Sequence, residues 1–150
     1  MKMISFLQVV IFILLAIHQM CGAAEDTELP KWINELRLNS SKTLRTEINV
    51  FNIKMPDPLK DGKYFLFCLK SEGSLDKVHD PFEAMHKMFS SSGWRYVLEY
   101  QADGHGSSSF AYEKGNYFSN IYVNIDSSCD DEETGHVPSK FWLEIYCREK

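Results

Sequence analysis

Histidines and carboxylates in two expected loops are the residues whose types could support chemistry. His105 lies in a turn with Asp103, and His136 follows the acidic run from Asp130 to Glu133. If these loops met, the two imidazoles and a carboxylate could bind zinc or transfer protons. The simpler interpretation, which we favour, is that both histidines are solvated turn residues.

The turn from Asp103 to Ser109 contains the three side-chain types of a catalytic triad. Neighbours within one turn rarely aim at a shared reacting centre, since triads are assembled from distant segments. The acidic run also lacks the alternating order of an EF-hand calcium loop. No nucleophile elbow, HExxH, P-loop or dinucleotide fingerprint is present. The sequence thus predicts no catalytic, cofactor-binding or metal-ligating residue and no cofactor.

The first 24 residues have the order of a secretory signal peptide. Lys2 precedes an apolar run from Ile4 to Ile17, and small residues follow. The run falls short of the roughly 20 apolar residues that span a bilayer. Gly22 and Ala24 suit a cleavage before Glu25. We expect a cleaved signal over 1–24, one domain over 25–150, and export to the periplasm or the exterior without a stable membrane anchor.

Two alternatives to cleavage after residue 24 remain. Cys21 could be the lipidated residue of a lipoprotein, but His18, Gln19 and Met20 before it are too large and too polar for that pattern. The apolar segment could also stay as an uncleaved anchor, which its short length disfavours.

Composition narrows the range of partners. The net charge of the chain is −5, and it becomes −6 without the leader because Lys2 is the leader's one charged residue. An acidic chain lacks the basic footprint of a nucleic-acid-binding protein. The 13% aromatic content indicates a packed, strand-rich core.

Three cysteines remain after cleavage, namely Cys68, Cys129 and Cys147, and none forms a CxxC pair. In an oxidising compartment we expect one disulfide. If strands 117–125 and 139–148 are hairpin partners, Cys147 lies roughly 27 Å along its strand from the loop that carries Cys129. A bridge needs Cα atoms within about 7 Å, so Cys129–Cys147 is disfavoured. The favoured bridge is Cys68–Cys147; pairing of Cys129 elsewhere and no disulfide at all remain open.

Apolar periodicity predicts the secondary structure. A short helix begins after Pro30 and is broken at Asn39-Ser40-Ser41, a triplet that would accept a glycan in a eukaryotic secretory pathway. A strand over 43–54 contains a bulge or twist near Phe51 and Ile53. A central strand over 64–69 is apolar on both faces.

Capping residues define a second helix. Asp80 caps it, Pro81 opens it, Glu83 lies three residues after the cap, and Gly93 ends it. Strands over 94–101, 109–113, 117–125 and 139–148 follow, with Gly115-Asn116 as a hairpin turn. The predicted fold class is α+β, with a single antiparallel sheet (a meander after residue 93) and two helices packed on one face.

The second half of the chain resembles small exported bacterial proteins of uncharacterised function. The resemblance is carried by Gly93-Trp94, Ala102-Asp103-Gly104, Ser108-Ser109-Phe110-Ala111-Tyr112, Lys114-Gly115, Asp130-Asp131, Val137-Pro138 and Cys147. Those proteins often carry a further cysteine where this chain has Phe118 and Ser119. The resemblance implies a bacterial source and an exported location, but no activity.

Three functions compete at this point. The first is a non-enzymatic exported protein that binds a protein partner, as an inhibitor, immunity protein or envelope accessory factor does. The second is a small secreted hydrolase that uses His105 or His136. The third is a small-ligand carrier with aromatic residues lining a groove between sheet and helix, namely Trp94, Tyr96, Tyr100 and Tyr112.

Overall fold

The computed structural model describes residues 28–127 and 135–150. The predicted signal peptide, Cys129 and the acidic run from Asp130 to Glu133 lie outside these residues. In the described part of the chain, no helix has the length and apolar character needed to cross a membrane.

The helix predicted from capping residues is confirmed as α3 (Pro81–Ser91). The Asp80 carboxylate accepts a hydrogen bond of 2.8 Å from the backbone nitrogen of Glu83. This bond satisfies one of the free amide groups of the first turn. Gly93 follows the helix with φ of 76°, a left-handed conformation that glycine adopts without a steric cost.

The predicted break at Asn39-Ser40-Ser41 is wrong, because α2 runs from Lys31 to Leu44. Ser40 is fully buried, and its hydroxyl lies 3.8 Å from the Met88 sulfur of α3. Packing of α2 against α3 thus outweighs the weak helix propensity of the serines. The residue after the helix, Arg45, has a positive φ of 51°. Asn39 lies exposed on the helix surface, not in a loop.

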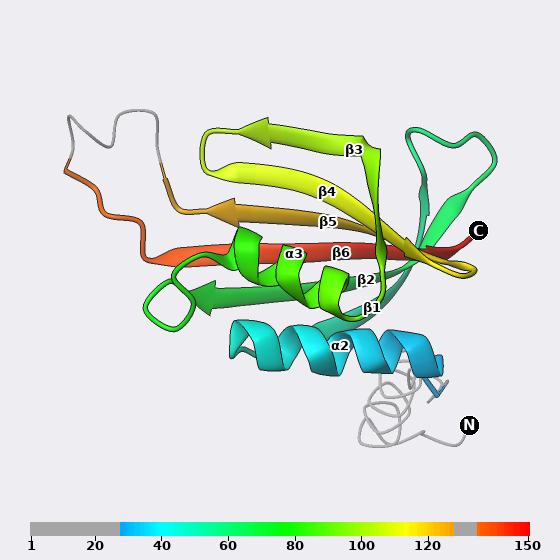
Figure 1. The fold of residues 1–150 in the computed structure, drawn as a ribbon, viewed down its shortest axis with the longest axis horizontal. Helices are drawn as coiled ribbons and strands as arrows, with labels where there is room; N and C mark the ends of the chain where they lie inside the picture. Colours follow the sequence, from blue (N-terminus) through cyan, green and yellow to red (C-terminus); the bar gives the residue numbers. More distant parts are fainter. Residues whose placement is uncertain (1–27, 128–134) are drawn as a thin grey trace, which may run out of the picture. The chain divides into compact units, whose positions relative to one another are not determined.

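Six strands form one antiparallel sheet in the order β1-β2-β6-β5-β4-β3. Their bounds are β1 (Asn49–Pro56), β2 (Tyr64–Ser74), β3 (Arg95–Gly104), β4 (Ser107–Lys114), β5 (Tyr117–Ile125) and β6 (Lys140–Glu149). The α+β class, the single antiparallel sheet and the meander after residue 93 are confirmed. The last strand, β6, lies between β2 and β5 and so joins the β1–β2 hairpin to the meander (Figure 1).

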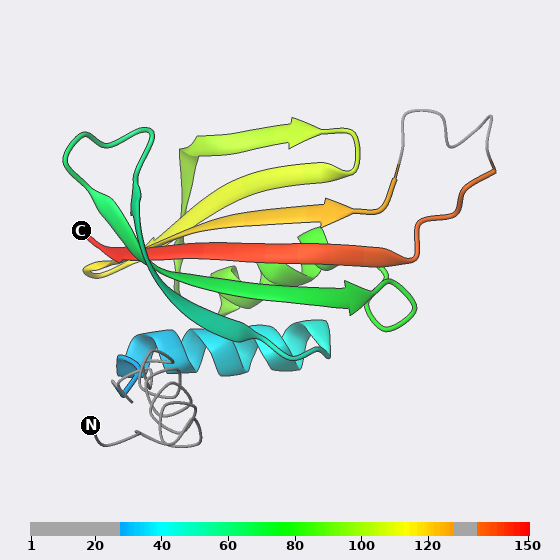
Figure 2. The same ribbon diagram turned by 180° about the vertical axis from the view of Figure 1, so that it is seen from behind.

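Both helices pack on the same face of the sheet. Phe89 of α3 stacks on Tyr112 of β4 at 4.9 Å between ring centroids, and Trp32 of α2 stacks on Tyr117 of β5 at 4.5 Å. The fully buried side chains beneath them include Leu69, Ile121, Phe141, Leu143 and Ile145. We call the other side of the sheet the open face; Figure 2 shows the molecule from that side, with α3 behind the strands.

Two strands depart from simple alternation. In β1 the register shifts between Asn52 and Met55, which confirms the predicted bulge, although the strand begins at residue 49 and not at 43. In β3 the pairing advances from Val97 to Ala102 while β4 advances only from Ala111 to Ser109. This wide bulge leaves Leu98 71% exposed while Tyr100 is buried. Leu98 and Tyr100 therefore do not share a face, as residues two positions apart do in a regular strand.

Candidate functional site

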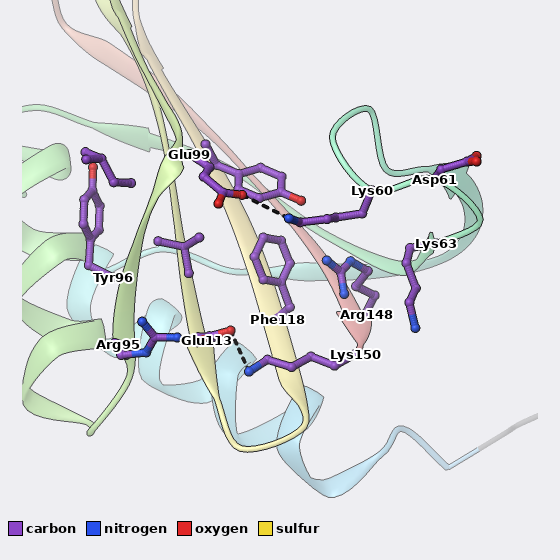
Figure 3. A pocket seen from close by; sticks show the side chains of 13 residues that line it. Lys60, Asp61, Lys63, Arg95, Tyr96, Glu99, Glu113, Phe118, Arg148 and Lys150 are labelled. Atoms are coloured by element: carbon purple, nitrogen blue, oxygen red, sulfur yellow. Dashed lines mark hydrogen bonds and ion pairs between the residues drawn. The ribbon is translucent and has the colours of Figure 1, made fainter.

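A pocket of about 660 Å³ lies between the loop of the β1–β2 hairpin, the bulge of β3 and the ends of β4, β5 and β6. Figure 3 shows the side chains that line it. They are mainly charged and aromatic: Lys60, Asp61, Lys63, Arg95, Tyr96, Val97, Leu98, Glu99, Tyr100, Glu113, Phe118, Arg148 and Lys150. The volume falls within the range of about 300–1,000 Å³ that is usual for ligand pockets.

A buried ion pair holds the walls of this pocket together. The Arg148 Nε donates to Asp57 Oδ2 at 2.9 Å, with 6% and 0% of the two side chains exposed. The Tyr100 hydroxyl lies 2.8 and 3.0 Å from the two oxygens of the same carboxylate. One carboxylate thus links the hairpin loop to β3 and β6. We call Asp57, Tyr100 and Arg148 the carboxylate node.

Hydrogen bonds within the turn 57–63 position the Asp57 carboxylate. Asp57 Oδ1 accepts a hydrogen bond of 3.0 Å from the backbone nitrogen of Leu59, and the backbone nitrogen of Asp57 donates to Lys63 O at 2.9 Å. Such side-chain-to-backbone bonds are the usual turn chemistry of aspartate. Burial, together with the bond to Asp57, raises the pKa of Tyr100 to about 12. The phenol therefore stays protonated as a donor through the physiological range.

Aromatic rings enclose the cation of the node. The guanidinium carbon of Arg148 lies 4.3 Å from the ring centroid of Phe118 and 6.0 Å from that of Phe65. A planar guanidinium binds well to such ring faces. Phe65 and Phe118 belong to a small second core on the open face, together with Tyr100 and Ala111. This core and the node make the pocket wall a preformed structure.

The two loop histidines lie at the other end of the sheet from the pocket. The turns that carry them are neighbours, because the Ile125 nitrogen donates to Gly106 O at 2.7 Å. The His136 imidazole bonds the backbone oxygen of Asp126. In the described residues, no three His, Cys, Asp or Glu side chains are grouped so that they could hold a metal ion. The hydrolase hypothesis for His105 and His136 remains a prediction.

His86 of α3 has a packing role. Its Nδ1 lies 2.9 Å from the Tyr112 hydroxyl, and its ring stacks on Phe110 at 4.0 Å. Burial lowers the pKa of this imidazole, which favours its neutral form. The histidine therefore satisfies a buried tyrosine hydroxyl and fills space under the helix.

The aromatic groove expected between sheet and helix is not one site. Tyr112 is buried under α3, and Trp94 lines a smaller pocket of about 260 Å³ with Trp32 and Tyr117. Tyr96 and Tyr100 line the larger pocket instead. The bulge in β3 accounts for this separation, because it breaks the alternation between Tyr96 and Tyr100.

Cys68 and Cys147 lie on the adjacent strands β2 and β6, and both are free, buried thiols in the structure. Cys147 pairs with Phe67, and Cys68 pairs with Tyr146. Paired residues share a face, so Cys147 lies on the face of Phe67. Cys68 is the next residue after Phe67, and neighbouring positions of a strand point to opposite faces. The two thiols therefore lie on opposite faces of the sheet. The register therefore argues against the predicted Cys68–Cys147 bridge, which peptide mapping without reduction can test directly.

We expect both thiols to resist modification in the native protein. Burial raises the pKa of Cys68 to about 11 and that of Cys147 to about 12, and the thiolate is the reactive form. A Cys129→Ser variant of residues 25–150 should give no colour with Ellman's reagent when native, and full reaction of both thiols when unfolded. No thiol after unfolding would instead establish the bridge.

Sequence reasoning named Tyr96 and Tyr100 as groove residues but missed the charged residues of the pocket. Lys60 and Lys63 belong to one turn, whereas Arg148 and Lys150 lie almost ninety positions later. The one local signal was Pro56-Asp57-Pro58, a turn sequence whose aspartate is now seen to be buried. Strand order, with β6 beside β2, brings the two segments together.

Known proteins offer no guide to this pocket. No family model, no curated protein and no solved structure matches the chain.

Proposed function

We propose that this chain is a small exported, non-enzymatic protein that binds a protein partner, in the manner of an inhibitor, an immunity protein or an envelope accessory factor. The observation that carries the proposal is the preformed pocket on the open face, with its walls joined by the carboxylate node. A site that is built before binding loses little conformational entropy when a partner docks.

The rim of the pocket supports a protein rather than a fully enclosed ligand. Leu98 lines the pocket and remains 71% exposed on the bulge of β3. A partner protein that covered this rim would bury apolar area that is now in contact with water, which favours association. The volume of the pocket alone would equally suit a small-ligand carrier, so Leu98 is the feature that favours the first function.

Site-specific photo-crosslinking tests the proposal. A photoreactive phenylalanine analogue replaces Leu98 in the pocket rim or, as a matched control, Leu38, which is 51% exposed on α2. In cells that produce the protein, we expect a discrete protein adduct from position 98 and none of that mass from position 38. The same adducts from both positions, or none from position 98, would contradict the proposal.

A further inference from the structure

The pocket has the opposite charge balance to the chain. Five of its lining residues are Lys or Arg, and three are Asp or Glu, whereas the whole chain has a net charge of −5. An excess of one sign of charge in a concave surface raises the local concentration of ions of the other sign. The pocket is therefore a local attractor for anions on an acidic protein.

The acidic lining residues form ion pairs with some of the lining cations but not with all of them. Glu99 pairs with Lys60 at 3.1 Å. Glu113 forms ion pairs with two cations. Its Oε1 contacts the Arg95 guanidinium, and its Oε2 lies 2.6 Å from the Lys150 Nζ. The third acid, Asp61, points away from the pocket in Figure 3.

Arg148 is paired with Asp57 outside the lining, so Lys63 is the lining cation without a carboxylate partner among the described residues. In the described residues, its ammonium has no hydrogen-bond or ion-pair partner. Figure 3 shows Lys63 on the same side of the pocket as Arg148 and Lys150. This cationic side of the pocket consists of Lys63, Arg148 and Lys150.

Arg148 gives the cationic side a rigid donor. Its Nε is held by Asp57 at 2.9 Å, and its Nη1 makes only a long contact of 3.4 Å with the Glu149 carbonyl. Among the described residues its Nη2 makes no hydrogen bond to a carboxylate, and the Tyr100 hydroxyl lies beside the guanidinium. Because Phe118 and Asp57 already fix the guanidinium, an incoming carboxylate meets donors whose orientation is set in advance.

An apolar strip lies within the same pocket. Val97 and Leu98 of the β3 bulge line it together with the Phe118 ring. Leu98 is exposed whereas Phe118 is buried. An apolar side chain of a bound peptide could therefore cover Leu98 while an adjacent acidic residue of the same peptide reaches the cations. A free inorganic anion would leave this strip uncovered, and an extended peptide would not.

We infer that the pocket recognises an acidic segment of the protein partner, with a carboxylate bound by Lys63, Arg148 and Lys150 and an adjacent apolar side chain against Leu98. The inference rests on the proposed function, because it takes the ligand to be part of a protein. It adds the chemistry of the partner, which the pocket itself specifies.

Peptide binding tests the inference. The probes are a fluorescently labelled peptide of alternating Glu and Leu residues and the same peptide with Gln in place of Glu, measured by anisotropy on the purified chain 25–150. We expect the Glu peptide to bind about tenfold more tightly, since hydrogen bonds to charged groups are the stronger ones. The difference should shrink at high salt.

Matched variants assign the effect to the pocket. Lys63→Gln combined with Lys150→Gln should abolish the preference for Glu over Gln. Lys42→Gln, at an exposed position on α2, should leave it unchanged. Both substituted pocket lysines lie at the surface, so the variant should retain the native melting temperature.

Several results would overturn the inference. They are equal binding of the two peptides, no binding of either at millimolar concentration, a preference that survives in the double variant, and inorganic phosphate that binds as tightly as the Glu peptide. The last would identify a small-anion site. If one of these occurs while Leu98 still crosslinks to a discrete protein, the acidic-segment inference fails and the proposed function stands.

Discussion

Asp57→Ala should destabilise the protein by about 3–5 kcal/mol, the usual cost of removing one partner of a buried ion pair. The variant leaves the Arg148 guanidinium enclosed by Phe118 without its counter-ion, since only 6% of that side chain is exposed. It also removes the acceptor of the buried Tyr100 hydroxyl. Urea unfolding followed by tryptophan fluorescence measures the change.

Replacement of both charges separates the ion pair from the space that it fills. Asp57→Leu combined with Arg148→Met removes the buried charges together, and well-packed apolar substitutes for a buried pair are often neutral or stabilising. We therefore expect this double variant to be more stable than Asp57→Ala.

An exposed ion pair of the same pocket provides the control. Glu99→Ala breaks the pair with Lys60, in which 66% and 48% of the side chains are exposed, and exposed pairs contribute little to stability. If Asp57→Ala cost no more than Glu99→Ala, the carboxylate node would not hold the fold together.

Because the carboxylate node holds the loop 57–63, its loss should let this loop open before the main core unfolds. The node ties the loop 57–63 to β3 and β6, and the main core lies on the other side of the sheet beneath the helices. Regions held by few interactions open locally at a lower free energy than the global core. We therefore expect loss of the node to deform the pocket first, which couples the stability of the fold to the shape of the pocket.

Local patterns in the sequence were sufficient where the chain satisfies its own hydrogen bonds. Asp80 and Glu83 fixed the start of α3, and the bond between them is present. The turn at Gly115-Asn116 predicted the β4–β5 hairpin, whose register is regular from Lys114 and Tyr117 onward. These features depend on neighbours in the chain, so they can be read without knowledge of the fold.

Prediction failed where distant contacts decide the structure. Ser40 reads as a helix breaker, yet burial against Met88 keeps it within α2. The spacing of Trp94, Tyr96 and Leu98 reads as a regular strand, yet β3 bulges after Val97. The pocket depends on both this bulge and the place of β6 beside β2. No local pattern encodes either, so the candidate site could not be predicted from the sequence.

Gly73→Ala should destabilise the protein markedly. A methyl group at this position of β2 would lie 2.1 Å from the ring of Phe141 on β6, its partner across the sheet. The ring is fully buried and cannot move into solvent. Overpacking of a core typically costs about 1–3 kcal/mol, and more when the neighbours cannot yield. Thermal or urea unfolding of the variant measures the loss.

A strand glycine without such a neighbour is the matched control. At Gly104 of β3 the added methyl would meet only the end of the Ser107 side chain, at 2.9 Å, and a flexible hydroxyl can rotate away. Gly104→Ala should therefore change stability much less than Gly73→Ala. Comparable losses at the two sites would show that strand glycine is needed for its backbone and not for the space under Phe141.

A double-mutant cycle decides whether the Phe141 ring is the cause. Phe141→Ala alone should cost about 3–5 kcal/mol through the cavity that it leaves. With the ring gone, the Gly73 methyl has room, so the cost of Gly73→Ala should largely disappear in the Phe141→Ala background. Contacting residues typically show such non-additivity, whereas independent sites add. Simple addition of the two losses would mean that glycine at position 73 serves the strand in some way unrelated to the ring that covers it.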